Sequence, residues 1–430
     1  MNGFNLSNIS NCCIGSAEAS AIYYGSNIVW QRDPEMSEYL WFMPTTTITY
    51  LDLESIGSMS DITIEYSTDK TTWTSLTISS GGSSRLTIRT NQKYYFRGNN
   101  SAYATSTTNY FRFNCTNIMS IGGNIMSLIY GDNFVGKTTL STSYAFACLF
   151  RDSIGLSDVS NLRLPATTLS SYCYMYMFYG CTSLTTAPKL PATTLSYACY
   201  SNMFERCTSL TTAPKLTATT LSSYCYYHMF WGCTMLTTTP ELPATTLQQY
   251  CYAYMFEGCT SLTTISKPQG SQYELPATTL KTGCYMSLFA GCTSLTNVPT
   301  SMLSASTTMA TGCYRNMFYG CEKLTKAPDL PATTLASQCY QHMFYGCKKL
   351  TKAPDLPATT LQQYCYAYMF QNCTSLGIIE CLATNISAAS CTSYWVYNVS
   401  STGYFYKKSS MTSWSTGASG IPSGWTVIDV

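Results

Sequence analysis

From Leu164 onward, apolar and polar residues repeat along the chain with a basic period of 26 residues. The hexapeptide LPATTL, in one copy LTATTL, begins at these leucines: Leu164, Leu190, Leu216, Leu242, Leu275, Leu330 and Leu356. The full unit reads LPATTLxxxCYxxMFxGCTSLTxAP, and its first cysteine stands at Cys173, Cys199, Cys225, Cys251, Cys284, Cys313, Cys339 and Cys365. A fixed period of this size predicts a repeat architecture in which each unit is buried by its neighbours.

Within each unit the pattern predicts a short helix followed by a short extended segment. Four apolar residues of the first unit lie four positions apart: Leu169, Cys173, Met177 and Cys181. This spacing is typical of an apolar stripe on a helix. Thr167 or Thr168 would be its N-cap, and Gly180 stands where it would end. Residues 184–188 are rich in β-branched residues and end in proline, which favours an extended segment. We therefore expect an α/β leucine-rich-repeat solenoid.

Degenerate copies flank the regular units, and two insertions interrupt them. One atypical copy covers residues 144–156, and another contains Cys391. Insertions lie near residues 266–273 and near Met302. Terminal repeats of a solenoid are atypical because they must cover its ends. The expected organisation is a solenoid at 121–398 with a carboxyl-terminal cap at 399–430.

The residues before the repeats alternate as strands do. SAIYYGSNIVW, within the segment 1–34, has two alternating runs around Gly25 and Ser26 and predicts a β-hairpin that would serve for attachment. Residues 35–120 contain further alternating runs with turn residues between them, which predicts a small all-β sandwich. The stretch EYSTDKTTW resembles a strand pair of an immunoglobulin- or fibronectin-type domain.

The composition of the chain favours a polar but uncharged surface. Charged residues make up 10% of the 430 residues and the net charge is +2. An ordinary soluble domain has roughly 25% charged residues. The near-neutral charge gives no field that would attract nucleic acid or an anionic membrane, so neither partner is expected. No apolar run is long enough for a transmembrane helix, and the amino-terminal residues lack the basic region of a secretory signal.

The repeat unit resembles the BspA-like leucine-rich-repeat family. The carrying motif is F-x-x-C-x-x-L with a flanking proline, and the LPATTL…YCYxxMFxGCTSLTxAP form is similar to the variant of gut Bacteroides and their crAss-like bacteriophages. The resemblance covers about residues 124–398. It implies a surface or adhesion protein, with no shared catalytic residues. The hairpin segment also resembles amino-terminal segments of phage structural proteins.

One stretch satisfies a nucleotide-binding pattern. Residues 131–138, from Gly131 to Thr138, read GDNFVGKT and match GxxxxGK[ST]. A phosphate-binding loop needs a preceding buried strand, which 124–130 could supply, and small residues around the phosphates. Asn133 and Phe134 are bulky there, and no βαβ unit follows. Nucleotide binding through Gly136, Lys137 and Thr138 is therefore the least favoured hypothesis.

The cysteines and histidines do not indicate a metal or redox site. Sixteen of the 22 cysteines occupy two columns of the repeat, eight residues apart, and no CxxC pair exists. Stacked small apolar side chains explain this pattern better than metal ligands do, and spacing alone leaves occasional disulfides open. His228 and His342 share one column four repeats apart, too far to bind one ion. No cofactor and no metal are expected.

Aromatic residues gather in the second, third and sixth positions after the first cysteine, the columns that vary between repeats. These positions are expected to face solvent and to offer rigid contact area for a sugar or a protein. The alternative is a solvated face in a tyrosine-rich chain. The candidate binding residues are Tyr176, Tyr179, Tyr227, His228, Trp231, Tyr254, Tyr319, His342, Tyr345 and Tyr368.

These features together predict a non-enzymatic bacteriophage virion surface protein: a fibre, a decoration protein or an adhesin. Its amino-terminal region would bind other virion structural proteins, and its repeats would bind a host-surface glycan or protein. Release by lysis would require no secretion signal. A homo-oligomer is compatible with this role. The alternatives are a bacterial BspA-like cell-surface adhesin and a nucleotide-binding enzyme.

Overall fold

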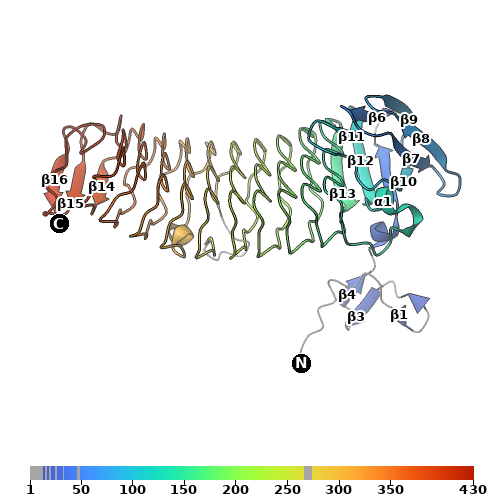
Figure 1. The fold of residues 1–430 in the computed structure, drawn as a ribbon, viewed down its shortest axis with the longest axis horizontal. Coiled ribbons are helices and arrows are strands. Elements are labelled where there is room, and N and C mark those ends of the chain that lie inside the picture. Colours follow the sequence, from blue (N-terminus) through green and yellow to red (C-terminus); the bar gives the residue numbers. More distant parts are fainter. Residues whose placement is uncertain are drawn as a thin grey trace.

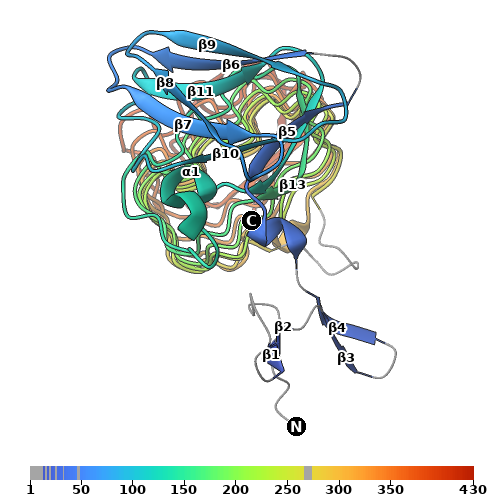
Figure 2. The same ribbon diagram turned by 90° about the vertical axis from the view of Figure 1, so that its right-hand side faces the viewer.

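The repeats form a long rod of stacked coils with a β-rich body at one end (Figure 1). The computed structural model describes residues 33–45, 49–265 and 274–430, and four short strands before residue 32. The insertion expected near 266–273 lies outside the described residues. Viewed along the rod, successive coils superpose and the body covers one end of the stack (Figure 2).

The four short strands pair as two antiparallel hairpins. β1 (Cys13–Ile14) pairs with β2 (Ala17–Glu18), and β3 (Ala21–Tyr24) pairs with β4 (Asn27–Gln31). The second pairing confirms the hairpin that the alternating runs predict. The turn at 25–26 lies outside the described residues.

Two sheets face each other in the body. The smaller sheet has the order β11 (Tyr110–Cys115), β6 (Thr49–Ile56), β9 (Ser83–Ile88). The larger has the order β13 (Leu156–Arg163), β12 (Met119–Asn124), β5 (Leu40–Pro44), β10 (Tyr94–Gly98), β7 (Ile62–Ser67), β8 (Thr74–Ile78). Rings from both sheets meet between them: Phe113 of β11 lies 4.9 Å from Phe42 of β5 and 5.2 Å from Phe96 of β10.

The strand order of the body differs from that of an immunoglobulin domain. There, the first two strands along the chain lie side by side in one sheet. Here β5 pairs with β10 in the larger sheet, whereas β6 pairs with β9 and β11 in the smaller one. The hairpin of β7 and β8 agrees with the expected strand pair, but the arrangement around it does not.

The larger sheet continues from the body into the rod. β12 pairs antiparallel with β5 and parallel with β13, the first extended segment of the rod. At this junction Gly123 lies so close to Tyr39 that a Cβ on Gly123 would overlap the Tyr39 carbonyl oxygen. β12 also crosses the boundary that the sequence suggests between 120 and 121. A shared sheet therefore joins body and rod.

The predicted helix of each repeat is wrong. Residues 172–180 form consecutive turns in which every fourth residue has a positive φ: Tyr172, Tyr176 and Gly180. The Met175 N–H donates to the Tyr172 carbonyl three residues back, at 3.1 Å, whereas the Tyr174 N–H donates to Cys199 of the next coil, at 3.0 Å. Each left-handed residue breaks the helical path and turns alternate amides toward the neighbouring coil.

The other side of each coil is also joined to its neighbours by backbone contacts. The last threonines of the KTTL segment at 137–140 and of the following ATTL segments form single parallel bridges in a row: Thr139, Thr168, Thr194, Thr220, Thr246 and Thr279. Thr168 is thus a bridge residue and not a helix cap. The extended segment 184–188 contains no assigned strand, although the Thr185 N–H donates to the Ser157 carbonyl at 3.0 Å. Near Met302, the three-residue insertion forms a single 3-10 turn, η4 (Thr300–Leu303).

Columns of identical residues fill the core of the rod. Both cysteine columns are fully buried, together with a tyrosine column next to the first and a phenylalanine column between them. Rings of one column stack nearly parallel from coil to coil. Phe178 lies 5.4 Å from Phe204, and Tyr174 lies 5.6 Å from Tyr200. Because each core side chain packs on its equivalents, the period of the sequence becomes the period of the stack.

Different residues close the two ends of these columns. Phe146 and Phe150 of the degenerate copy connect the two ring stacks to Tyr103 and Phe113 of the body. At the other end Trp395 lies 6.2 Å from both Tyr366 and Phe370. The segment after Trp395 adds β15 (Tyr404–Lys407) and β16 (Thr426–Asp429) to β14 (Ile378–Cys381) in a parallel sheet at this end. The Trp395 Nε1–H donates to the Gly420 carbonyl in this cap, at 2.8 Å.

The described part of the chain contains little helix. Helical turns occur at η2 (Pro34–Ser37), α1 (Ser127–Tyr130), η3 (Gly131–Asn133) and η4. Among these residues, none of the helices has the length and hydropathy needed to cross a membrane.

Candidate functional site

The ten candidate aromatic residues form two groups on the rod. The amino-terminal aromatic group contains Tyr176, Tyr179, Tyr227, His228, Trp231 and Tyr254. The carboxyl-terminal aromatic group contains Tyr319, His342, Tyr345 and Tyr368. Between them lies the coil of Cys284, which has Met286, Ser287 and Ala290 in the same columns.

Left-handed backbone positions carry the third column of both groups. His228 has a φ of 55° and Tyr254 one of 60°, a region that is unfavourable for residues with a Cβ. Hydrogen bonds on both sides hold this conformation. The His228 N–H donates to Ala253 of the next coil at 3.1 Å, and its carbonyl accepts the Trp231 N–H, also at 3.1 Å. The rings are therefore placed by rigid backbone.

His228 is the centre of the amino-terminal aromatic group. Its ring lies 4.2 Å from that of Tyr227, 4.7 Å from that of Tyr254 and 6.1 Å from that of Trp231. Burial lowers the pKa of His228 to about 4. The imidazole is therefore neutral at pH 7, and one of its nitrogens can accept a hydrogen bond.

Two arginines alternate with the rings of this group. The Arg206 guanidinium lies over Trp231 at 5.2 Å and over Tyr179 at 5.9 Å. Arg151 lies over Tyr179 at 4.9 Å and over Tyr176 at 5.2 Å. A guanidinium stacked on a ring keeps its N–H groups at the edge, where they can bind a ligand oxygen. The alternation provides flat surfaces and donors side by side.

Carboxyl groups of two glutamates are buried beneath the same surface. Glu205 is only 8% exposed, and Asn202 donates a hydrogen bond to its Oε2, which lies 3.9 Å from His228 Nδ1. Oε2 of Glu257 is buried with no hydrogen-bond partner among the described residues. Burial raises the pKa of both carboxyl groups. The rings and the guanidinium donors together can bind a hydroxyl-rich ligand with flat faces.

The sequence prediction missed these charged residues. Arg206 occupies a column where most units have glycine, and it keeps the left-handed φ of that column, 61°. This departure from the repeat is visible in the sequence and could have identified Arg206 as a candidate. Arg151 belongs to the degenerate copy, which lacks the cysteines used to align the columns. Glu205 and Glu257 share the column of Tyr179 and Trp231.

The carboxyl-terminal aromatic group is made mainly of rings stacked on one another. Tyr319 and Tyr345 stack at 4.6 Å, and so do His342 and Tyr368. Burial lowers the pKa of His342 to about 4, and its Nδ1 has no hydrogen-bond partner among the described residues. Tyr319 of this group is the most exposed of the ten candidates, at 40%.

The expectation that these three columns face solvent is wrong for several members. The following residues of the same columns are buried: Ser201, Asn202, Glu205, Met286 and Gln341. Of the ten candidates Tyr319 is the most exposed, at 40%, and the others are half-buried. Adjacent coils lie so close that side chains in one column cover those in the next.

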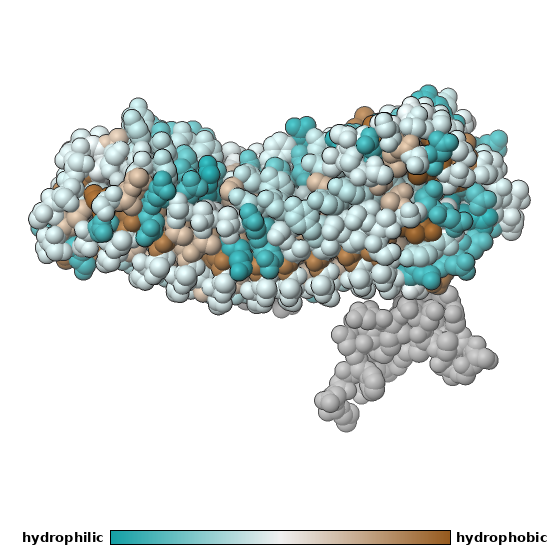
Figure 3. Space-filling model, in the orientation of Figure 1, coloured by the Kyte–Doolittle hydropathy of each residue, from teal (hydrophilic) through white to brown (hydrophobic). Residues whose placement is uncertain are grey.

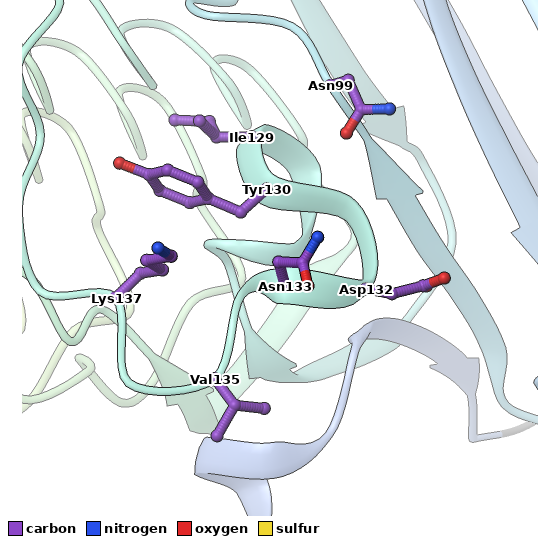
Figure 4. A pocket seen from close by; sticks show the side chains of 7 residues that line it. All are labelled: Asn99, Ile129, Tyr130, Asp132, Asn133, Val135 and Lys137. Atoms are coloured by element: carbon purple, nitrogen blue, oxygen red, sulfur yellow. The ribbon is translucent and has the colours of Figure 1, made fainter.

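The Gly131–Thr138 segment does not form a phosphate-binding loop. The strand ends at Asn124, and α1 and η3 follow, so the strand expected over 124–130 is wrong. No helix begins at Thr138. The segment lines a hollow of about 710 Å³ with Asn99, and Lys137 and Asp132 lie on opposite sides of Asn133 there (Figure 4).

Internal contacts already use the charges of this hollow. The Lys137 ammonium lies 5.2 Å from the Tyr130 ring centroid. Asp132 accepts hydrogen bonds from Arg97 at 2.6 Å and from Tyr39 at 2.9 Å.

The cysteine columns contribute to packing. In the second column each thiol donates to the carbonyl of a phenylalanine in the preceding coil, as from Cys233 to Phe204 at 3.1 Å. The 20 cysteines of the described residues are free, and burial raises the pKa of Cys199 to about 12. No three metal-binding side chains of the described residues cluster around a cation-sized space.

The comparison with protein families gives one match. A family model described as BspA type leucine rich repeat region (6 copies) matches residues 171–309 and 284–418, which together span more than half of the chain. No curated protein matches the chain, and no solved structure matches it.

Proposed function

Because the chain belongs to the BspA-type leucine-rich-repeat family, we propose that it is a non-enzymatic surface protein that binds a glycan or a protein through the side of its rod. The repeats act as a leucine-rich-repeat solenoid whose stacked columns hold the binding residues in place. Repeat proteins commonly bind through such extended surfaces.

The amino-terminal aromatic group is the observation that carries this proposal. Trp231 and Tyr179 sit on rigid backbone with Arg206 between them. Trp, Tyr and Arg are the residues that most often dominate binding energies at interfaces. The body and the carboxyl-terminal cap close the two ends of the stack, which leaves the sides of the rod as its open surface (Figures 1 and 2).

The composition of the surface supports recognition through neutral polar contacts. On the face shown in Figure 3, most of the rod has intermediate hydropathy, with separated hydrophilic patches. Such a surface does not attract charged polymers over long distances. Binding then depends on close contacts such as ring stacking and short hydrogen bonds.

We place this surface on a bacteriophage virion, with the amino-terminal region bound to other virion proteins. The support is the resemblance of the repeat variant and of the hairpin segment to phage proteins. The second candidate is the surface of a bacterial cell, which the family supports equally. Mass spectrometry of purified virions and of cell envelopes decides between them. Presence in envelopes and absence from particles would refute the virion assignment.

A glycan array tests the binding role. We expect wild-type protein to bind defined glycans and Trp231→Ala to lose about 2 kcal/mol, or roughly thirtyfold in affinity, as is usual for a central tryptophan. Tyr404→Ala is the matched control, because Tyr404 is 50% exposed and lies in the cap. Equal binding of all three proteins would remove the aromatic group from the site. If wild-type protein binds none of the glycans, the ligand is a protein, and binding of the same variants to intact cells tests it.

A further inference from the structure

Five tyrosines outside the candidate columns form a ladder along the rod. The tyrosine ladder consists of Tyr144, Tyr172, Tyr197, Tyr224 and Tyr250, one from each of five successive coils. Successive ring centroids are 4.6, 5.3, 5.6 and 5.2 Å apart. All five side chains are half-buried except that of Tyr197, which is 40% exposed. The ladder is continuous and reaches solvent.

The rings of the ladder differ in orientation. Tyr144 and Tyr172 are parallel within 5°, whereas Tyr197 is turned by 71° from Tyr172 and by 52° from Tyr224. Tyr197 is therefore not stacked on either neighbour. Its ring is the most exposed of the ladder and can stack on a ligand, with phenol groups before and after it.

The residues that precede the ladder tyrosines within their own coils are uncharged. Serines and glutamines directly precede the ladder tyrosines of the regular coils: Ser170, Ser171, Ser196, Ser222, Ser223, Gln248 and Gln249. In the next coil, the corresponding positions hold Lys281 and Thr282. Gly283 follows them, and a Cβ there would overlap the ring of Tyr250. The ladder thus has a defined end and presents hydroxyl and amide groups, which suit a neutral, hydroxyl-rich ligand.

The spacing of the ladder rings fits a polysaccharide better than a peptide. An extended peptide presents side chains on one face every two residues, about 6.6 Å apart. A polyproline II helix repeats after three residues, about 9 Å. Both repeat distances are longer than the ring spacing of the ladder. The length of one hexopyranose unit along a β-1,4-linked chain is close to that spacing. A sugar polymer can therefore stay in register with successive coils.

We propose that the tyrosine ladder binds an uncharged, extended β-1,4-linked polysaccharide lying parallel to the rod, with a sugar ring stacked on Tyr197. The inference rests on the proposed binding function and names the ligand class for a second site. The two sites adjoin, because Tyr227 of the amino-terminal aromatic group lies 5.5 Å from Tyr224. A polymer on the ladder would thus pass beside the first site.

The test is calorimetric titration of the full chain with β-1,4-linked glucose and N-acetylglucosamine oligomers of two to six units. Affinity should rise with each added unit up to five, the number of rings. Tyr197→Ala should weaken hexamer binding about tenfold, the loss expected for one stacked ring. Tyr197→Phe should bind like wild type, which separates loss of the ring from misfolding.

Tyr364→Ala is the matched control. Tyr364 occupies the equivalent position of a later coil, but Gln338 and Ser390 stand at that position on either side, so it belongs to no ladder. Its replacement should leave hexamer binding unchanged. Failure of all oligomers to bind, affinity independent of length, equal losses in Tyr197→Ala and Tyr364→Ala, or binding of a proline-rich peptide in place of sugar would each overturn the proposal.

The Trp231→Ala variant separates this proposal from the general one. If Trp231→Ala no longer binds the glycan that wild-type protein binds on the array, and wild-type protein does not bind the oligomers, only the ladder assignment fails. If oligomers bind through Tyr197 and Trp231→Ala keeps every array ligand, only the aromatic-group site fails.

Discussion

Replacing Phe256 by alanine tests how the rod is held together. Phe256 is fully buried at the middle of the phenylalanine column, with the rings of Phe230 and Phe289 each 5.6 Å away and within 6° of parallel. Truncating a buried phenylalanine costs about 3–5 kcal/mol. Because the ring loses a partner on both sides, we expect about 4 kcal/mol and not the lower end of that range.

Native-state hydrogen exchange is the appropriate assay, because a repeat array need not unfold in one step. The informative amides join neighbouring coils: Phe230 N–H to Met255, Phe256 N–H to Leu288, and Phe289 N–H to Met317. A loss of about 4 kcal/mol would speed their exchange roughly a thousandfold. Amides of the distant body should not change, and Tyr404→Ala should stay within about 0.5 kcal/mol of wild type. Exchange accelerated less than tenfold would refute the reasoning that stacked rings stabilise the coils.

Three further predictions follow from the backbone, the thiols and the histidines. Asn316 has a φ of 58°, so Asn316→Val should destabilise the rod in urea by about 1–2 kcal/mol more than Asn316→Gly does; a helix at this position would give the opposite order. The described thiols should not react with a thiol reagent until the protein unfolds, because they are buried and their pKa values are raised; fast labelling of native protein would contradict this. Burial lowers the pKa of His228 and of His342 from 6.5 to about 4. The unfolded chain therefore binds these protons first, and stability that is complete above pH 6.5 should fall as the pH drops toward 4. The variant His228→Gln/His342→Gln should lose less stability than wild type between pH 7 and 4.5 in urea melts. An unchanged dependence of stability on pH would show that groups other than these histidines determine it.

The sequence was sufficient to predict the repeat but not its backbone path. An ideal helix turns by about 100° per residue, so a step of four residues overshoots a full turn by about 40°, and three steps by about 120°. A stripe at Leu169, Cys173, Met177 and Cys181 could not have stayed on one helix face. The strict four-residue period is instead made by left-handed residues such as Tyr176. Tyrosine at such a position is not a recognised signal, which is why the pattern was read as a helix.

The candidate site was predicted in composition but not in contacts. Comparing the units identified the aromatic columns, because variation within a repeat marks positions that the core does not fix. It could not show that Arg206 lies between Tyr179 and Trp231, since that contact involves three successive coils. The tyrosine ladder was missed because only columns after the first cysteine were compared, whereas the ladder residues precede it. Its coil of Cys199 also places the tyrosine one residue earlier, at Tyr197, than its neighbours do.

Hydrogen exchange of the full chain with and without the strongest glycan of the array tests the central claim most directly. If the side of the rod is the binding surface, bound glycan should protect amides at 176–179, 202–206 and 227–231, and Trp231→Ala should abolish this protection. Protection confined to the body at 33–124 or to the cap at 399–430, with the rod unchanged, would contradict the account.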